Sequence, residues 1–206
     1  MQSKSYKYII YKHKGGKPHD FFDNININGH VLANNDYDKF KINNYASTYG
    51  EITRHGFKKM LEGIDTKNKI FYDLGSGVGK SVVWAVTDHG LYGNGIELSK
   101  ARHDLALQLL NQIRQIKPEF VQKMNYINDD IFNRNIGNAN IIFISNLCFP
   151  EDVNQKLAIK LSNELKPGTL IFCSKELQNP KIRLIGTKNI DMTWSKDSNI
   201  HHYIIV

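Results

Sequence analysis

The chain of 206 residues predicts an α/β fold built on a mostly parallel sheet with an antiparallel C-terminal strand. Short apolar runs alternate with stretches of helical periodicity, which is the pattern of successive βα units. A glycine-rich turn at 73–80 joins one such run to a helical stretch. Two β-like runs near the end, at 182–193 and 201–206, are suited to pair as antiparallel strands.

A small β-rich appendage is predicted over residues 1–45. Gly-Gly and Asn-Gly pairs separate its β-like runs, which include the alternating run at 24–32, and such pairs favour hairpins. The main domain is expected to cover 46–206. Lysines make the appendage basic: Lys4, Lys7, Lys12, Lys14 and Lys17.

The main domain is expected to alternate helices and strands along its length. Its first helix lies near 57–64, where apolar residues recur at helical spacing. A longer helix should begin after Ser99, a residue type that caps helix N-termini, and should end before Pro118. The other expected elements are strands at 70–74, 125–127, 141–144 and 169–173, a strand ending at Glu97, and helices at 81–87 and 153–165.

The charge balance is basic. Lys and Arg number 27 against 20 Asp and Glu, which gives a formal net charge of +7. This excess favours an anionic partner, above all nucleic acid held without sequence preference. An AT-rich coding genome would also raise the lysine content without any selection for binding, and the two explanations stand about even. No apolar run approaches the ~20 residues of a membrane span, so we expect no membrane contact.

The cysteines and histidines predict no metal site. Cys148 and Cys173 each lie in an apolar, β-like context, so we expect free buried thiols in a reducing compartment. Eight histidines include the pair His201 and His202, but no cysteine or acid lies near them at zinc-like spacing.

The turn at 73–80 indicates the class of ligand. A phosphate-binding P-loop would need glycine at Leu74, and a dinucleotide fingerprint would need glycine or alanine at Lys80, so neither pattern fits. What remains is D-x-G-x-G-x-G with a downstream acid, the pattern of S-adenosylmethionine sites in class I methyltransferases with a Rossmann-like fold. Its members are Asp73, Gly75, Gly77, Gly79 and Glu97.

The two acids of this pattern have distinct expected roles. Asp73 ends a strand just before the turn and is placed to face the ammonium group of the methionine moiety. Glu97 ends the next strand and is placed to accept hydrogen bonds from the ribose hydroxyls.

With these elements placed, about three quarters of the chain resembles the disruptor-of-telomeric-silencing (Dot-one-like) family of non-SET histone lysine methyltransferases. The segment at 42–51, with its Tyr-Gly-Glu ending, is similar to the family's loop over the cofactor, and 71–79 is nearly its first motif. The segment 145–149 is similar to the strand-to-helix part beside the transferred methyl group. Ser174-Lys175 and Thr193-Trp194 fit the final motifs.

The resemblance, added to the glycine motif, implies two groups of site residues. The expected catalytic residues are Asn146, Phe149, Trp194 and Tyr49. In this group Phe149 and Trp194 would wall the lysine channel, and Asn146 would orient the cofactor or the amine through its side-chain oxygen. The expected cofactor contacts are Tyr49, Gly50, Glu51, Ile52, Thr53, Asp73, Gly75, Ser76, Gly77, Gly79, Lys80, Glu97, Asp130, Ile131 and Asn146.

Three positions depart from the family pattern. Ile52 separates Tyr-Gly-Glu from the hydroxyl of Thr53, which directly follows that triplet in the family. Lys80 replaces a glutamine and adds a cation suited to pair with the methionine carboxylate. His201 stands near the end of the chain, where the family places aromatic hydroxyls.

The resemblance implies an S-adenosylmethionine-dependent protein lysine methyltransferase that acts on a core histone in the nucleosome, and hence in the nucleus. The alternatives are a non-histone lysine methyltransferase, which would also fit the cytoplasm, and an inactive cofactor-binding module that docks on nucleic acid. A base N-methyltransferase is disfavoured because Asn146 is followed by Leu147-Cys148-Phe149 rather than a Pro-Pro-aromatic run.

Overall fold

The computed structural model describes residues 21–22, 24–43, 45 and 47–206. A seven-stranded sheet forms the centre of this described part, in the order β3-β2-β1-β4-β5-β7-β6. Five strands are mutually parallel, and β7 is antiparallel to both β5 and β6. The mostly parallel sheet with an antiparallel C-terminal strand is thereby confirmed. The strands are β1 Ile70–Leu74, β2 Tyr92–Glu97, β3 Met124–Asn128, β4 Ile141–Ile144, β5 Leu170–Cys173, β6 Ile182–Met192 and β7 Ser195–Ile205.

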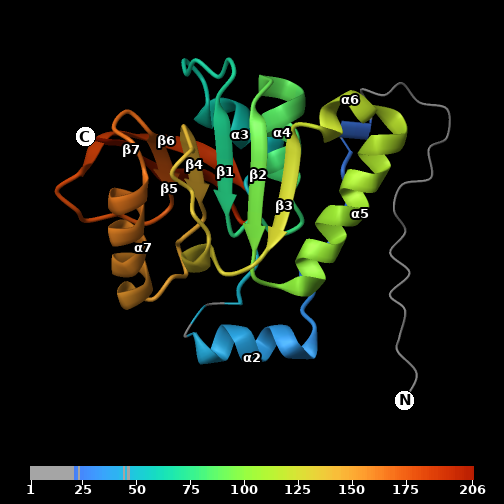
Figure 1. Ribbon diagram of the computed structural model, residues 1–206, viewed down its shortest axis with the longest axis horizontal. Coiled ribbons are helices and arrows are strands. Elements are labelled where there is room, and N and C mark those ends of the chain that lie inside the picture. The colour runs from blue at the N-terminus through green and yellow to red at the C-terminus, as the bar shows by residue number, and fades with distance from the viewer. Residues whose placement is uncertain (1–20, 23, 44, 46) are drawn as a thin grey trace.

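Helices cover both faces of the sheet (Figure 1). Buried side chains of α3, α4 and α5 form one apolar cluster with Phe71 of β1, and α7 forms a second cluster with the neighbouring Tyr72. Successive strand residues therefore serve opposite faces, as a fully buried parallel strand requires. The helices are α2 Asn34–Ile42, α3 Arg54–Met60, α4 Lys80–His89, α5 Lys100–Ile116, α6 Pro118–Val121 and α7 Glu151–Glu164, with a 3-10 turn η1 at Ile131–Asn133.

Local sequence signals explain where these helices begin and end. Thr53 accepts a hydrogen bond from the Gly56 N–H at 3.0 Å and caps α3. Ser99 caps α5 in the same way, through the Arg102 N–H at 3.2 Å. Glycines in the left-handed region flank α4, where Gly90 ends the helix at φ 68°. None of the helices in the described part of the chain combines the length and apolarity that crossing a bilayer requires.

The predicted β appendage is wrong where the structure describes it. Residues 24–33 run without strand pairing, and α2 follows at Asn34–Ile42. The alternation at 24–32 reflects an extended segment that buries Ile27 in the main core while its asparagines at 24, 26 and 28 face solvent. The expected hairpin before residue 21 lies outside the described residues.

Parallel register brings the ends of the central strands to one edge of the sheet. Asp73 of β1 pairs with Gly95 of β2 on one side and with Phe143 of β4 on the other. Ligands of open α/β sheets bind at the carboxyl ends of such strands. Helix α2 crosses below these ends in Figure 1, so the N-terminal segment covers the edge where a ligand is expected.

Candidate active site

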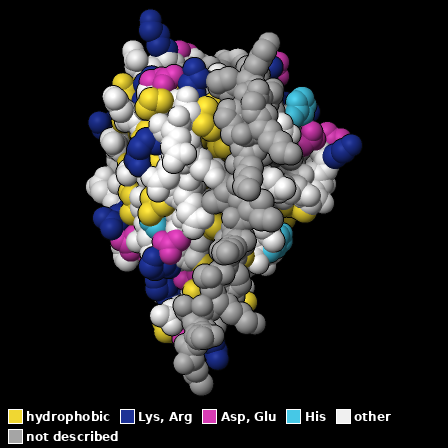
Figure 2. Space-filling view, turned by 90° about the vertical axis from the view of Figure 1, so that its right-hand side faces the viewer, with side chains coloured by type: hydrophobic (Ala, Val, Ile, Leu, Met, Phe, Trp, Pro, Cys, Tyr) yellow, Lys and Arg dark blue, Asp and Glu magenta, His cyan; other side chains and the backbone are white. Residues whose placement is uncertain are grey.

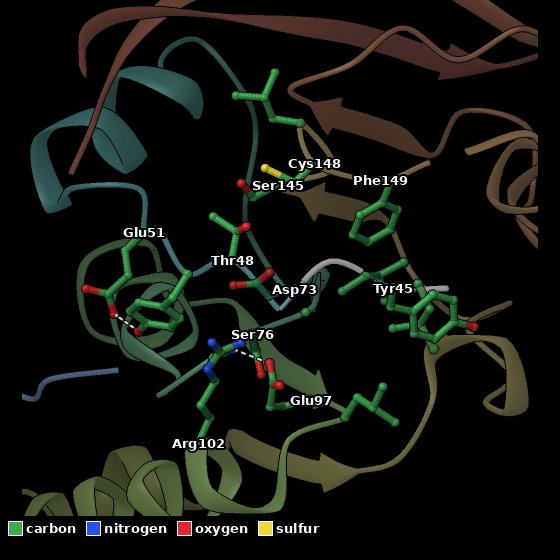
Figure 3. Close-up of a pocket in the computed structure, with 18 of the residues that line it drawn as sticks. Tyr45, Thr48, Glu51, Asp73, Ser76, Glu97, Arg102, Ser145, Cys148 and Phe149 are labelled. Atoms are coloured by element: carbon green, nitrogen blue, oxygen red, sulfur yellow. Dashed lines mark hydrogen bonds between the residues drawn. The ribbon is translucent and has the colours of Figure 1, made fainter. Parts of the chain in front are cut away.

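A cavity of about 370 Å³ lies at this edge of the sheet. It is lined by the turn after β1, the end of β2, the segment after β4, the N-terminal segment at 45–52, and Trp194 from the β6–β7 turn. Its size is within the range of small-molecule sites. In Figure 3, Asp73 lies near the centre, with Glu51 and Arg102 to one side and Tyr45 and Phe149 to the other.

The glycine turn is a backbone shape that other residues adopt only with strain. Gly75, Gly77 and Gly79 have φ values of 90°, 56° and 80°, all in the left-handed region. A Cβ on Gly77 would lie 2.7 Å from the ring of Tyr49, and one on Gly79 would lie 2.3 Å from the ring of Tyr126. Gly75 and Gly77 line the cavity, whereas Gly79 does not and is the N-cap residue of α4.

Glu97 is a buried carboxylate at the end of β2. Its Oε2 accepts from the Gly77 N–H at 2.8 Å and its Oε1 from the Ser99 N–H at 2.8 Å. Burial raises its pKa, while the nearby Arg102 guanidinium and the two N–H donors oppose that rise. The carboxylate thus joins the glycine turn to the start of α5 and lines the cavity between them.

Asp73 is the least compensated acid of the cavity. It is 5% exposed, and its one hydrogen-bond donor among the described residues is the Ser81 hydroxyl. Burial raises the pKa of Asp73 to about 7, and the neighbouring carboxylates of Glu97 and Glu51 add to the rise. A carboxyl held in this state favours a cation beside it.

The buried hydroxyl of Ser76 also has no partner in the described structure, although it lines the cavity. Buried polar groups of folded proteins are nearly always hydrogen-bonded. The unpaired hydroxyl and the poorly compensated Asp73 are therefore suited to a polar ligand that carries a cationic group, as the S-adenosylmethionine expected from the sequence does.

The Tyr-Gly-Glu triplet closes one side of the cavity. The Tyr49 hydroxyl donates to Glu51 Oε1 at 2.5 Å, and the Lys80 ammonium lies 2.7 Å from Glu51 Oε2. Lys80 therefore forms an ion pair with Glu51, whereas the sequence suggested the methionine carboxylate of the cofactor as its partner. Gly50 leaves room for the indole of Trp194, because a Cβ there would lie 2.3 Å from the ring.

The other predicted cofactor residues divide into two groups. Ile52, Asp130 and Ile131 line the cavity, and Asp130 Oδ2 accepts from the Tyr45 hydroxyl at 2.9 Å. Thr53 is not among the lining residues, since its hydroxyl caps α3 and donates to the Asp191 carbonyl at 3.0 Å.

The segment after β4 forms the opposite wall. Phe149 and Trp194 both line the cavity, and Trp194 is 45% exposed, so it stands at the mouth. Asn146 does not line the cavity; its amide is fully buried and bonds to Asn154 and to the backbone of Lys175. The Asn146 side-chain oxygen, predicted to orient the cofactor or the amine, accepts from the Lys175 N–H at 2.8 Å, and Ser145 is the neighbouring polar residue that lines the cavity.

The lining residues outside the predicted set include Tyr45, Arg102 and Ser145. The position of Arg102 in the sequence could have indicated its place, because it lies one helical turn after Ser99, the N-cap residue of α5 that closely follows Glu97. Cys148 was expected to be buried, and it is instead exposed at the cavity wall, because the chain turns outward after Asn146; Cys173 is buried as predicted.

The histidine pair lies away from the cavity. His201 and His202 belong to β7 and are not among the lining residues, and the His202 ring stacks on Phe172 at 4.2 Å. No group of three or more metal-ligating side chains occurs in the part of the chain that the structure describes.

Comparison with known proteins adds a family match. The model of the family "Histone methylation protein DOT1" matches residues 25–203. Three relatives named "Histone-lysine N-methyltransferase, H3 lysine-79 specific" come from Debaryomyces hansenii, Eremothecium gossypii and Caenorhabditis elegans. They are 26%, 31% and 27% identical over 70%, 63% and 76% of this chain. The chain spans 13%, 24% and 17% of their respective lengths.

Solved structures support the fold. A Salinibacter ruber RNA methyltransferase in complex with S-adenosyl-L-homocysteine has a TM-score of 0.56 at 24% identity, covering 72% of this chain and 89% of that one. A putative methyltransferase from Escherichia coli has a TM-score of 0.57 at 13% identity, covering 74% of this chain and 84% of that one. These likenesses show a class I, Rossmann-like methyltransferase fold.

Proposed function

The chain belongs to the DOT1 family of histone methylation proteins, and we propose that it is an S-adenosylmethionine-dependent lysine methyltransferase acting on a core histone in the nucleosome. The relatives' names suggest lysine 79 of histone H3 as the target. Such a substrate implies a role in the nucleus.

The observation that carries this proposal is that Asp73 and Glu97 line the same cavity but differ in their hydrogen-bond donors. One acid is buried with a single hydroxyl donor, and the other is held by two backbone N–H groups. We assign Asp73 to the ammonium group of the cofactor and Glu97 to its ribose hydroxyls. When bound, S-adenosylmethionine supplies a methyl group on a positively charged sulfur.

The chain's own contribution to the reaction is alignment and dehydration. A lysine ammonium has no free electron pair, so the substrate amine must lose a proton before it can attack. Phe149 and the half-exposed Trp194 form an apolar approach to the cavity, where desolvation lowers the pKa of an entering amine and favours its neutral form. Holding the amine in line with the methyl group then lowers the barrier.

The test is to incubate the protein with methyl-labelled cofactor and three substrate preparations: free histones, nucleosomes, and a total protein lysate. We expect label on histone within nucleosomes. Asp104→Ala, on the exposed side of α5, is the matched control for Glu97→Ala, which should transfer less label at limiting cofactor. Label confined to a lysate protein would indicate a non-histone substrate. Cofactor binding without transfer to any preparation would indicate an inactive module.

A further inference from the structure

Asn154 is a buried polar residue of α7 that the proposed reaction does not use directly. It is 4% exposed and does not line the cavity. Its Oδ1 accepts from Asn146 Nδ2 at 2.7 Å, and its Nδ2 donates to the Glu176 carbonyl at 2.7 Å. One side chain therefore joins α7 to the segment after β4 and to the segment after β5.

Asn146 completes the same network from the other side. Besides its bond to Asn154, its Nδ2 donates to the Lys175 carbonyl at 3.2 Å, and its Oδ1 accepts from the Lys175 N–H at 2.8 Å. Its backbone carbonyl accepts from the Phe149 N–H at 3.0 Å, which closes the turn at 146–149. Both amides thus have partners for their donors and acceptors inside the protein.

The turn fixed by this network is one wall of the cavity. Ser145, Leu147, Cys148 and Phe149 line the cavity, while Asn146 between them points into the protein. Because Asn146 is anchored and its neighbours face the cavity, a shift of Asn146 would shift the residues that line the cavity wall. Leu147 is 54% exposed and Cys148 is also exposed, so little packing from outside holds the turn.

We propose that Asn154 is a positioning residue for methyl transfer: through Asn146 it holds the 145–149 wall, which receives the substrate amine, at its working distance from the cofactor. This inference rests on the proposed function. Displacement by about 1 Å of groups that align reactants costs up to about a hundredfold in rate, even when the changed residue touches no reactant.

The variants are Asn154→Ala, Asn146→Ala and the double variant. Asn154→Asp keeps the side-chain volume and the acceptor for Asn146 but turns an oxygen toward the Glu176 carbonyl, so it removes that hydrogen bond without leaving a cavity. Circular dichroism checks that each variant is folded. Ser162→Ala is the matched control. Ser162 is also a buried polar residue of α7, it accepts from Asn179 Nδ2 at 3.0 Å, and it does not line the cavity.

In the kinetic assay with nucleosomes, Asn154→Ala and Asn146→Ala should each lower kcat by about tenfold to a hundredfold. The cofactor Kd should stay within about twofold of the wild-type value, because alignment is lost while cofactor contacts remain. The double variant should be little worse than either single variant, since the two amides act as one unit. Ser162→Ala should keep the wild-type kcat.

Cys148 provides a readout that does not depend on activity. It is the exposed cysteine of the two in the chain and lies in the turn itself. Its rate of alkylation by iodoacetamide should change in Asn154→Ala and Asn154→Asp but not in Ser162→Ala. Unchanged alkylation in both Asn154 variants would overturn the proposal, even if the wild type methylates no substrate. A kcat of Asn154→Ala equal to that of Ser162→Ala would also overturn it, and so would a loss of cofactor affinity in Asn154→Ala as large as its loss of kcat.

Discussion

Asp73 and Glu97 show how two carboxylates at the ends of adjacent strands acquire different properties. Glu97 receives two backbone N–H donors at 2.8 Å, which stabilise its charge. Asp73 receives a single hydroxyl donor, and its charged form is disfavoured first by burial and then by the nearby charges of Glu97 and Glu51. Glu97 is therefore suited to accept hydrogen bonds from hydroxyls, and Asp73 is suited to a cation.

Glu97→Ala should weaken binding of S-adenosyl-L-homocysteine by about 1.5–3 kcal/mol, the scale of hydrogen bonds to a charged group. The substitution also leaves the Gly77 and Ser99 N–H groups without their acceptor. Calorimetry measures the effect, with Asp104→Ala as the control from the exposed side of α5. Equal affinity in wild type and Glu97→Ala would remove the ribose assignment.

Asp73 should couple cofactor binding to proton release. Its pKa is raised from 3.8 to about 7 in the folded protein, so its contribution to stability is present at low pH and is lost as pH rises through 7. A ligand ammonium beside it favours the ionised form, and affinity should therefore rise between about pH 4 and pH 7. Calorimetry in buffers of different ionisation enthalpy should detect the released proton in wild type and no such proton in Asp73→Asn. Buffer-independent binding enthalpy in the wild type at pH 6 would contradict this prediction.

At the scale of residues, the sequence identified the acids but not every direction of a side chain. Asp73 and Glu97 could be predicted because Asp73 lies next to the end of its strand, just before the glycine turn, and Glu97 ends the next strand; parallel register places both at one edge. Ser145 and Asn146 follow β4, where strand alternation ends, so spacing does not say which residue faces the cavity. The hydrogen bond from Asn146 to Asn154, eight positions further on, holds the Asn146 side chain inside the protein.

At the scale of elements, the start of α5 fastens the N-terminal segment over the cavity. Asp36 of α2 accepts from the Ser99 hydroxyl at 2.7 Å and from the Lys100 N–H at 2.9 Å, so it supplies an anion at the N-terminus of α5. Arg102, within the first turn of α5, donates to the carbonyls of Gly29 at 3.1 Å and Ser47 at 2.8 Å. The N-terminus of α5 therefore contacts both Glu97, through the Ser99 N–H, and the N-terminal segment above the cavity.

Arg102→Ala should loosen this cover. Its guanidinium also lies 4.7 Å from the centre of the Tyr49 ring, so removal takes away two hydrogen bonds and a cation–π contact. We expect faster dissociation of S-adenosyl-L-homocysteine and faster amide exchange over 24–51. Arg114→Ala, on the exposed end of α5, is the control and should change neither quantity. Matching exchange in the two variants would show that Arg102 does not hold the cover.

The strands and longer helices followed from the sequence, whereas of the N-terminal cover only the loop at 42–51 was expected, through the family resemblance. Helix α5 was predictable because Ser99 marks its start and apolar residues repeat along it. The alternating run at 24–32 gave the signal of a strand, but it finds no strand partner and packs Ile27 against the core. Helix α2 is mostly polar and is held by Asp36 and Phe40, which is too little apolar pattern to predict a helix.

At the scale of the whole molecule, the formal net charge of +7 raises the question of where the basic side chains lie. On the face in Figure 2, lysine and arginine side chains lie at several separate places, some of them beside acidic residues. The described part of that face therefore presents no single basic patch. The five lysines at positions 4, 7, 12, 14 and 17 are the densest basic cluster of the sequence.

Nucleosome binding should depend on salt, and these lysines should set part of that dependence. The logarithm of affinity should fall linearly with the logarithm of salt concentration, with a slope that reflects the number of phosphates neutralised. Deleting residues 1–20 should make the slope shallower, and replacing the five lysines by glutamine should have the same effect while keeping the length. An unchanged slope in both variants would assign the DNA contact to another part of the chain.

The most direct test of the central proposal is the position of the transferred methyl group. Nucleosomes are incubated with the protein and with cofactor carrying an isotopically labelled methyl group, and the histones are then digested and analysed by mass spectrometry. The proposed function predicts the label on a lysine side chain of histone H3, lost in Trp194→Ala because that variant removes part of the apolar approach. Nucleosomes without label on any lysine, although calorimetry shows bound cofactor, would contradict it.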